Sequence, residues 1–391
     1  KWMGESMGLK RTDALGKKLE YERTFEKKVK RKRKLRTKYS GLLGEVKAAY
    51  SAQQDHKLAT QLFGELIRRN VEIFGVCRQM SLMKGALENH GEKEFNTFKE
   101  KLMPRLSGFY EKYRGNIDQE ILAGQIESYV EHKPKSLVWN GLTDALKKHG
   151  SADALASHLF SNSTVVDGSK MTMLMSKDPQ AFMLAMVNDP VLTFYEGLNK
   201  HFYEVVDPIY KQQQTEIDDL QREYMKAQME VFKKKTFYPD ANSTLRVTYG
   251  KVQGYSTPEA GQYKPVTYFR GVIDKYVPGD YEFDVHPKLL ALHESKDFGA
   301  YADNTGDVPV CFIGSNHTSG GNSGSPAIDA HGNLIGLNFD RVWEGTMSDI
   351  NYDVSICRNI MVDIRYVLFI IDKFAGADHL IKEMKLVHPK A

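Results

Sequence analysis

The apolar positions in the first part of the chain recur at helical spacing. Across residues 58–74 they make one broad stripe, formed by Leu58, Leu62, Phe63, Leu66, Ile67, Ile73 and Phe74. A stripe of this width is typical of an amphipathic helix that buries one face. Gly141, Gly150 and the Asp189-Pro190 pair interrupt the pattern. Residues 1–236 are therefore predicted to form an all-α domain of several helices joined by short turns.

The pattern changes after Phe237-Tyr238-Pro239. Residues 245–255, 268–276 and 308–314 are short runs rich in β-branched and aromatic residues, divided by Gly, Pro and Asn. Such runs are typical of strands. The apolar segment 366–371 then predicts a terminal helix. The predicted fold class is therefore α+β with two domains, helices at 1–236 and a six-stranded β-barrel with a terminal helix at 237–391.

Composition narrows the class of protein only slightly. The 391 residues are 41% hydrophobic and 27% charged, with a net charge of +4, which is ordinary for a globular protein and gives no general argument for nucleic-acid binding. No stretch approaches the roughly 18 continuous apolar residues of a membrane span. Cys77, Cys311 and Cys357 are distant from one another and are expected to be buried free thiols, with no disulfide framework and no metal site.

One segment departs from this even charge distribution. From Lys27 to Lys38, nine of twelve positions are Lys or Arg. The run could bind phosphate groups, or it could attract acidic substrates if its helix faces an active site. The favoured interpretation is a solvated helix face, because Glu20, Glu22 and Glu26 lie just upstream.

The strongest chemical signal is Gly321-Asn322-Ser323-Gly324-Ser325-Pro326. It resembles the nucleophile turn of chymotrypsin-type serine peptidases, in which glycines permit a tight backbone around an exposed serine. In such a turn the amides of Gly321 and Ser323 would form an oxyanion hole. The residues that follow predict a strand at 327–328, a turn at 331–333 and a returning strand at 334–337. The serine elbow of α/β-hydrolases is excluded, because position 325 is Ser rather than Gly.

A serine nucleophile needs a general base, usually a histidine oriented by a carboxylate. His286, His293, His317 and His331 are the histidines nearest in sequence, and none has the local setting of a catalytic base. The base and its aspartate are therefore expected on polypeptide outside this chain. On this interpretation the chain is the C-terminal part of a peptidase with two barrels, and it should be inactive alone.

Asn322 bears on how such a site would form. Peptidases activated by zymogen cleavage carry Asp before the nucleophile, where it pairs with a new amino terminus. Asn has no charge for that pair. The residue favours a bacterial-type peptidase whose site forms on folding.

The returning strand leads to two neighbouring charges, Asp340 and Arg341. In this fold the strand lies beside the substrate, so both side chains could turn into the cleft where the strand ends. Asp340 could pair with a substrate amine and Arg341 with a substrate carboxylate through its bidentate fork. The alternative is that both residues form a solvent-exposed strand end.

Four segments together resemble one family, the bacterial dipeptidyl peptidases 7 and 11. The segments are 320–326, 336–344, 353–358 and 362–366. The resemblance implies that the helical part caps the cleft, and that the enzyme removes dipeptides from free amino termini without a metal or organic cofactor. It also implies a homodimer, in the periplasm or at the cell surface of a Gram-negative bacterium.

Carried over residue by residue, the resemblance makes Ser323 the nucleophile and Asp340 a residue that holds the substrate α-amino group. In this family a glycine at position 341 accompanies hydrophobic preference, whereas an arginine accompanies preference for Asp or Glu. Arg341 therefore implies the dipeptidyl peptidase 11 type, which fits the attraction between a guanidinium and a carboxylate. Two alternatives stay open: a glutamyl endopeptidase of the same fold, and a non-enzymatic binding module that uses the basic run Lys27–Lys38.

Overall fold

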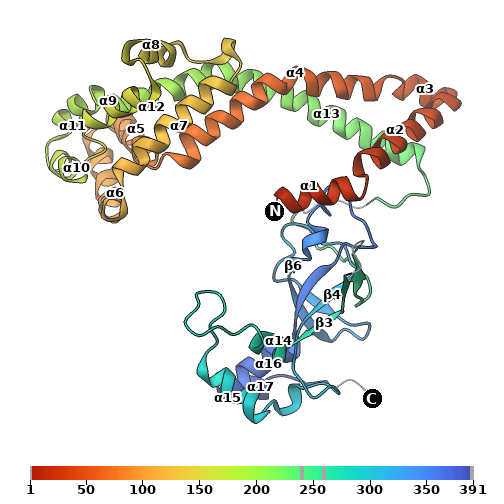
Figure 1. The fold of residues 1–391 in the computed structure, drawn as a ribbon. Coiled ribbons are helices and arrows are strands. Elements are labelled where there is room, and N and C mark those ends of the chain that lie inside the picture. Colours follow the sequence, from red (N-terminus) through yellow and green to blue (C-terminus); the bar gives the residue numbers. More distant parts are fainter. Residues whose placement is uncertain (1, 238–241, 258–260, 388–391) are drawn as a thin grey trace. The chain divides into compact units, whose positions relative to one another are not determined.

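The computed structural model describes residues 2–237, 242–257 and 261–387 (Figure 1). It divides into two compact units, one formed by Lys1–Arg31 together with Lys234–Ala391, the other by Lys32–Lys233. The unit that contains the sheets thus includes the first residues of the chain, which the sequence pattern grouped with the helices. Tyr238 and Pro239, where that pattern changes, lie outside the described residues.

The unit Lys32–Lys233 is helical, as predicted. Its helices are α3 (Arg33–Tyr39), α4 (Leu42–Phe63), α5 (Ile73–His90), α6 (Glu92–Lys112), α7 (Gly115–His132), α8 (Asn140–His149), α9 (Ala152–Ser161), α10 (Gly168–Met175), α11 (Pro179–Val187), α12 (Pro190–His201) and α13 (Asp207–Val231), with short turns of tighter or wider helix at η1 (Gly64–Asn70), η2 (Lys135–Leu137) and η3 (Phe202–Val206).

Two of the three predicted helix breaks, at Gly150 and Asp189-Pro190, lie at helix ends, whereas Gly141 is the second residue of α8. Gly150 follows α8 with a φ of +86°, a conformation that favours glycine. Asp189 precedes α12 and its carboxylate accepts the backbone N–H groups of Val191 and Leu192, each at 3.1 Å. The apolar stripe of α4, η1 and α5 enters one large core, in which Leu66 and Ile73 are fully buried.

The other unit contains α1 (Trp2–Arg11), α2 (Ala14–Arg31) and a sheet. The remaining elements are β1 (Tyr255–Ser256), β2 (Gln262–Tyr263), β3 (Val266–Tyr268), α14 (Phe269–Ile273), α15 (Pro287–Ser295), η4 (Gly299–Tyr301), β4 (Pro309–Gly314), β5 (Pro326–Ile328), β6 (Leu334–Arg341), η5 (Trp343–Gly345), β7 (Asn359–Asp363), α16 (Ile364–Phe369), η6 (Ile370–Phe374) and α17 (Asp378–Lys382). Five strands pair antiparallel in the order β3-β4-β7-β6-β5, and β1 pairs with β2.

The predicted six-stranded barrel is not what the described residues form. Their main sheet has five strands and is open, with β3 and β5 at its edges. The predicted strand 245–255 contributes only a bridge from Val252 to Gly314 and the start of β1. Leu245, Val247 and Tyr249 are between 85% and 97% exposed. Their apolar side chains have no surface to pack against among the described residues, so this run does not form the predicted strand. The run 268–276 is mostly α14, because tertiary packing of Phe269 overrides its strand propensity.

The hairpin after the candidate nucleophile is confirmed. β5 and β6 pair antiparallel, and Gly332 in the turn has a φ of +83°. A Cβ at Gly336 on β6 would lie 2.5 Å from the carbonyl oxygen of Val362 and 2.7 Å from the ring of Phe312, so only glycine fits there. The terminal helix predicted from 366–371 corresponds to α16 and η6.

The segment 342–353 that follows β6 is held by the first helix. Gly8 of α1 lies against Met347, which is fully buried, and Asn351 donates to the hydroxyl of Thr12 at 3.0 Å. Lys17 forms an ion pair with Asp353 at 3.3 Å. We refer to residues 342–358, which connect the two strands, as the β6–β7 loop.

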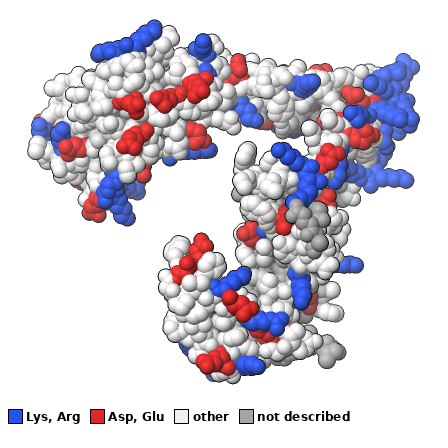
Figure 2. Space-filling view, viewed as in Figure 1, with Lys and Arg blue, Asp and Glu red and all other residues white. Residues whose placement is uncertain are grey.

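The basic run forms a solvated surface. Its lysines and arginines are exposed, whereas Val29 and Leu35 between them are buried. Lys30 pairs with Glu26 at 3.9 Å and Lys38 with Glu230 at 3.2 Å. Figure 2 shows the basic side chains of α3 at the surface of the helical unit. The exposure of these side chains agrees with the favoured interpretation, a solvated helix face.

All three cysteines are free. Cys77 and Cys357 are buried as predicted, and Cys311 is half-buried. Among the described residues no helix has the length and apolar character needed to cross a membrane.

Candidate active site

The turn before β5 presents Ser323 at the surface. Gly321 and Gly324 on either side have φ values of +93° and +82°, which residues with a Cβ rarely adopt. Ser323 is exposed, and its Oγ donates to the carbonyl oxygen of Phe339 on β6 at 3.2 Å. The two glycines therefore turn the serine hydroxyl towards the far end of the returning strand.

Backbone hydrogen bonds fix this turn against β6. The N–H of Gly324 donates to the carbonyl of Asn338 at 2.7 Å, and the N–H of Asn338 donates to the carbonyl of Ser325 at 2.9 Å. Asn322 contributes its side chain, whose Oδ1 accepts the N–H of Ser319 at 3.0 Å. Sequence reasoning considered only the missing charge of Asn322; its local role is to close the loop that leads to the serine.

Two amides of the turn are unused. Within the described residues, the N–H groups of Gly321 and Ser323 donate to no protein acceptor. They belong to the two residues predicted to form an oxyanion hole. The turn can therefore offer two donors to a developing negative charge.

The four late histidines have other contacts. His286 accepts the N–H of Lys288 at the start of α15, and His293 lies against the ring of Phe269. His331 is exposed in the β5–β6 turn, and the Nε2 of His317 lies 3.1 Å from the carbonyl oxygen of Ser348. The hydrogen bond of Ser323 goes to Phe339 and to none of these rings.

A bulge at Phe339 lies directly before the two predicted recognition residues, Asp340 and Arg341. The register of β6 with β7 runs Asn338 to Met361, then Asp340 to Ile360 and Arg341 to Asn359. One extra residue on β6 breaks the alternation of sides. β6 ends at Arg341, so the two charges lie at the end of the strand, as the sequence indicated.

The two charges have different surroundings. Asp340 is exposed, and its carboxylate accepts the N–H of Arg341 at 2.8 Å but has no cationic partner among the described residues. The side chain of Arg341 is 18% exposed, and its Nη1 lies 2.8 Å from the Oγ of Ser348 and 3.0 Å from the Oδ2 of Asp349. Arg341 is therefore not a solvent-exposed strand end, and sequence reasoning missed Ser348 and Asp349.

Buried polar groups lie behind these residues. Asn359 on β7 donates to the side chain of Asn338 at 2.8 Å, and no described residue donates to its own Oδ1. Arg358 is 4% exposed and donates to four backbone carbonyls, which ties the end of the β6–β7 loop to residues 253–254. Since each bond satisfies a buried donor, this segment is held firmly.

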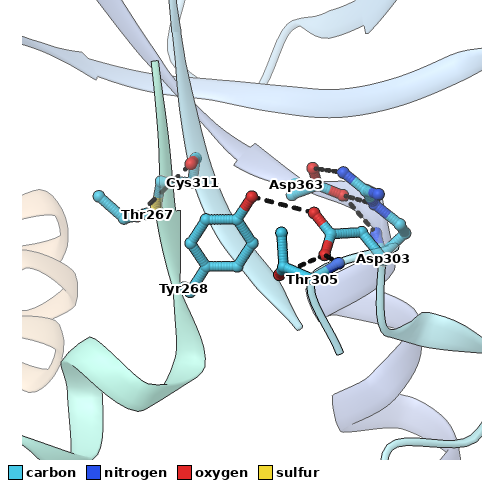
Figure 3. A network of polar contacts seen from close by, with 7 residues as sticks. Thr267, Tyr268, Asp303, Thr305, Cys311 and Asp363 are labelled. Carbon is cyan, nitrogen blue, oxygen red and sulfur yellow. Dashed lines mark hydrogen bonds and ion pairs between the residues drawn. The ribbon is translucent and has the colours of Figure 1, made fainter. Parts of the chain in front are cut away.

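A second polar network lies at the other edge of the sheet (Figure 3). Tyr268 donates to Asp303 at 3.0 Å, and Thr305 donates to the same carboxylate. Burial raises the pKa of Asp303, but hydrogen bonds from Thr305 and Tyr268 outweigh it and lower the pKa below its ordinary value. Asp363 pairs with Arg365 at 2.7 Å at the start of α16. The first contacts join β3 to the segment 303–305, and the last joins the end of β7 to α16.

No group of three or more His, Cys, Asp or Glu in the described part of the chain could hold a metal ion. A hollow of about 610 Å³ lies beside β3 and α14, and its lining includes none of the predicted site residues. The chemistry that the described residues bring together is thus a surface hydroxyl, two amide donors, a carboxylate and a guanidinium.

Comparison with known proteins places this geometry in a family. Residues 1–386 match the family described as Peptidase S46. The Asp/Glu-specific dipeptidyl-peptidase of Flavobacterium psychrophilum is 45% identical over 390 residues, which cover 100% of this chain and 54% of that protein. Dipeptidyl-peptidase 7 of Phocaeicola vulgatus is 33% identical over 361 residues, 91% of this chain and 49% of that protein.

Among solved structures, Porphyromonas endodontalis DPP11 in complex with substrate is similar with a TM-score of 0.82 and 28% identity, over 97% of this chain and 54% of that one. The same protein in complex with the dipeptide Arg-Glu gives a TM-score of 0.80 over the same shares. The chain spans about half the length of the curated relatives that it matches. Because the family match extends over residues 1–386 of the 391-residue chain, the chain belongs to the peptidase S46 family.

Proposed function

We propose that the protein carrying this chain is a serine exopeptidase that releases dipeptides from free amino termini and prefers Asp or Glu as the penultimate residue. One observation carries the proposal. The hydroxyl of Ser323 bonds to the carbonyl of Phe339, the residue directly before Asp340 and Arg341. A nucleophile and two charges suited to recognising a peptide end thus lie on one hairpin.

In this proposal Ser323 attacks the carbonyl carbon of the second peptide bond. Its hydroxyl leaves the Phe339 carbonyl and passes its proton to a general base, and the unused amides of Gly321 and Ser323 stabilise the oxyanion. The intermediate then collapses: the C–N bond breaks, and the base gives its proton to the departing amine of the shortened peptide. Water, deprotonated by the same base, attacks the acyl-enzyme and releases the dipeptide together with the free Ser323 hydroxyl. No step needs a metal or organic cofactor.

The base and its orienting aspartate belong, in our proposal, to the part of the enzyme outside this chain. The contacts of the four late histidines support this, since each histidine is engaged elsewhere or exposed in a turn. The length of the relatives leaves room for a second catalytic half. The open sheet would then be one part of a chymotrypsin-like catalytic domain. In this proposal the helical cap, predicted at 1–236, is limited to Lys32–Lys233, and the unit that contains the sheets forms the second barrel.

Recognition of the substrate rests on the two neighbouring charges. Asp340 is exposed and lacks a cationic partner among the described residues, so its carboxylate is available to a substrate α-ammonium. The guanidinium of Arg341 is largely buried, so a substrate carboxylate can satisfy its remaining N–H donors, whereas an apolar side chain would leave those donors without an acceptor. Relatives named Asp/Glu-specific dipeptidyl-peptidase support this assignment. A homodimer in the periplasm or at the cell surface completes the proposal.

The test uses the full-length enzyme and fluorogenic dipeptides of the form Xaa-Asp. Ser323→Ala should abolish turnover while leaving the melting temperature unchanged, because the side chain is exposed. Ser325→Ala, two positions along the same turn, is the matched control and should keep activity. Turnover by the Ser323→Ala enzyme would exclude this serine as the nucleophile.

Arg341→Gly tests the selection of acidic residues. We expect selective loss of Xaa-Asp cleavage and a relative gain for apolar penultimate residues; an unchanged preference would place selection elsewhere. The same assay separates the exopeptidase from a glutamyl endopeptidase. A substrate with an acetylated amino terminus should resist the exopeptidase, because Asp340 then has no ammonium to bind, whereas an endopeptidase would cleave it.

A further inference from the structure

Arg341 already has a carboxylate partner within its own chain. Its Nη1 contacts the Oδ2 of Asp349 at 3.0 Å and the Oγ of Ser348 at 2.8 Å. Asp349 itself is 35% exposed. An ion pair of this kind neutralises the cation before any substrate arrives.

The geometry leaves the other side of the guanidinium open. A guanidinium has five N–H donors, and both known contacts use Nη1. Within the described residues, Nη2 and Nε have no acceptor. A substrate carboxylate can therefore bind the Nε–Nη2 edge with two parallel hydrogen bonds, and Asp349 need not move.

We propose that Asp349 is a resident counter-ion that determines how strongly the Arg341 pocket discriminates between acidic and neutral side chains. The inference rests on the proposed function and names a residue that tunes its specificity. With a neutral substrate, Asp349 keeps the buried cation paired, so the penalty for that substrate is reduced. With an acidic substrate, two carboxylates flank one guanidinium and their repulsion weakens binding.

The β6–β7 loop is held well enough for the charge of Asp349 to be changed alone. The carbonyl of Ser348 accepts from His317, and Met347 is fully buried. Asn351 on the other side bonds to Thr12. Substitution of Asp349 by the isosteric Asn therefore removes a charge without removing these anchors.

The experiment compares a matched pair of substrates, Xaa-Asp and Xaa-Asn, in the full-length enzyme at low ionic strength. Asp349→Asn should lower KM for Xaa-Asp by about 3- to 10-fold, since like charges roughly 6 Å apart repel by that factor at effective dielectric constants of about 80 down to about 40. The Asp:Asn ratio of kcat/KM should rise by at least the same factor. The gain should diminish at high salt, because exposed charges are screened.

Two further variants separate charge from positioning. Asp349→Glu restores the charge and should return the ratio towards the wild-type value. Ser348→Ala keeps both charges but removes one bond that orients Arg341, so it should lower kcat/KM for Xaa-Asp rather than raise it. Each variant is first compared with the wild type by thermal unfolding, and Asp349→Ser replaces any Asn variant that melts early.

The outcomes are distinct. A higher KM for Xaa-Asp in Asp349→Asn, or an unchanged Asp:Asn ratio, would overturn the counter-ion role and leave the proposed function standing. A wild-type enzyme that cleaves Xaa-Asn as well as Xaa-Asp would overturn the preference for acidic residues and the inference with it.

Discussion

Replacing Lys133 by Met should stabilise the protein at neutral and acidic pH. Lys133 directly follows α7 and is 3% exposed, within the core of the helical unit. Its Nζ donates to the hydroxyl of Tyr129 and lies 4.3 Å from the centre of that ring. No carboxylate among the described residues pairs with it. Burial lowers the pKa of Lys133 to about 7, because a charged amine is poorly solvated there.

The size of the effect follows from linkage. The pKa of Lys133 falls from 10.5 in the unfolded chain to about 7 in the folded protein, so between these values the unfolded chain binds more protons. Stability therefore rises with pH through this window, and below pH 7 the full penalty of about 5 kcal/mol applies. Met removes that penalty. It also leaves the hydroxyl of Tyr129 without a partner, which costs about 1–3 kcal/mol.

We therefore expect Lys133→Met to be more stable than the wild type by about 2–4 kcal/mol at pH 6, and less stable by about 1–3 kcal/mol above pH 10. Urea unfolding followed by circular dichroism from pH 6 to pH 10.5 measures the difference. The double variant Lys133→Met with Tyr129→Phe lacks the unpaired hydroxyl and should be more stable than Lys133→Met alone at every pH. Lys135→Met, an exposed lysine two residues on, is the control and should show no such slope. A difference between Lys133→Met and wild type that does not change with pH would refute the buried-cation argument.

Three further changes test the sheet unit. Gly336→Ala should lower the free energy of unfolding by about 1–3 kcal/mol, because a Cβ there meets the Val362 carbonyl at 2.5 Å. Gly271→Ala is the control and should not lower it, because the space around Gly271 is open. Urea unfolding compares the two variants. Gly8→Val should raise KM for Xaa-Asp several-fold, because the valine side chain would displace Met347 and with it the β6–β7 loop. An unchanged KM would mean that α1 does not support the surroundings of Arg341. Asp340→Asn should raise KM for free-amine substrates about 10- to 100-fold, the value of a hydrogen bond to a charged group, and a KM within twofold of wild type would remove Asp340 from amine recognition.

Local sequence patterns predicted the elements whose stability is local. The helices of 32–233 follow from their apolar stripes and from breakers such as Gly150 and Asp189-Pro190. The hairpin from β5 to β6 follows from a turn with glycine between two apolar runs. In each case the residues that define the element are close in sequence, so the pattern contains most of the information.

The sheet could not be predicted in the same way. Residues 245–249 alternate as a strand does, yet Leu245 and Tyr249 are almost fully exposed, because a strand also needs a neighbour and a surface to cover. The run 268–276 has strand propensity, but Phe269 is buried in a cluster with Leu292 and Phe369 and the chain there is helical. Long-range packing decided both segments.

The candidate site shows the same division between local and distant information. Ser323 and its flanking glycines can be recognised from six consecutive residues of the sequence. Ser348 and Asp349, the partners of Arg341, belong to no recognisable sequence motif, and only the fold of the β6–β7 loop brings them to the guanidinium. That loop in turn depends on α1, at the opposite end of the chain, through Gly8 and Thr12. The carbonyl of Ser348 also accepts from His317, in the segment that leads to Ser323. A displacement of α1 would therefore reach both Arg341 and the turn at Ser323, the residues proposed for specificity and nucleophilic attack. Substitutions in α1 should therefore alter substrate preference without touching substrate.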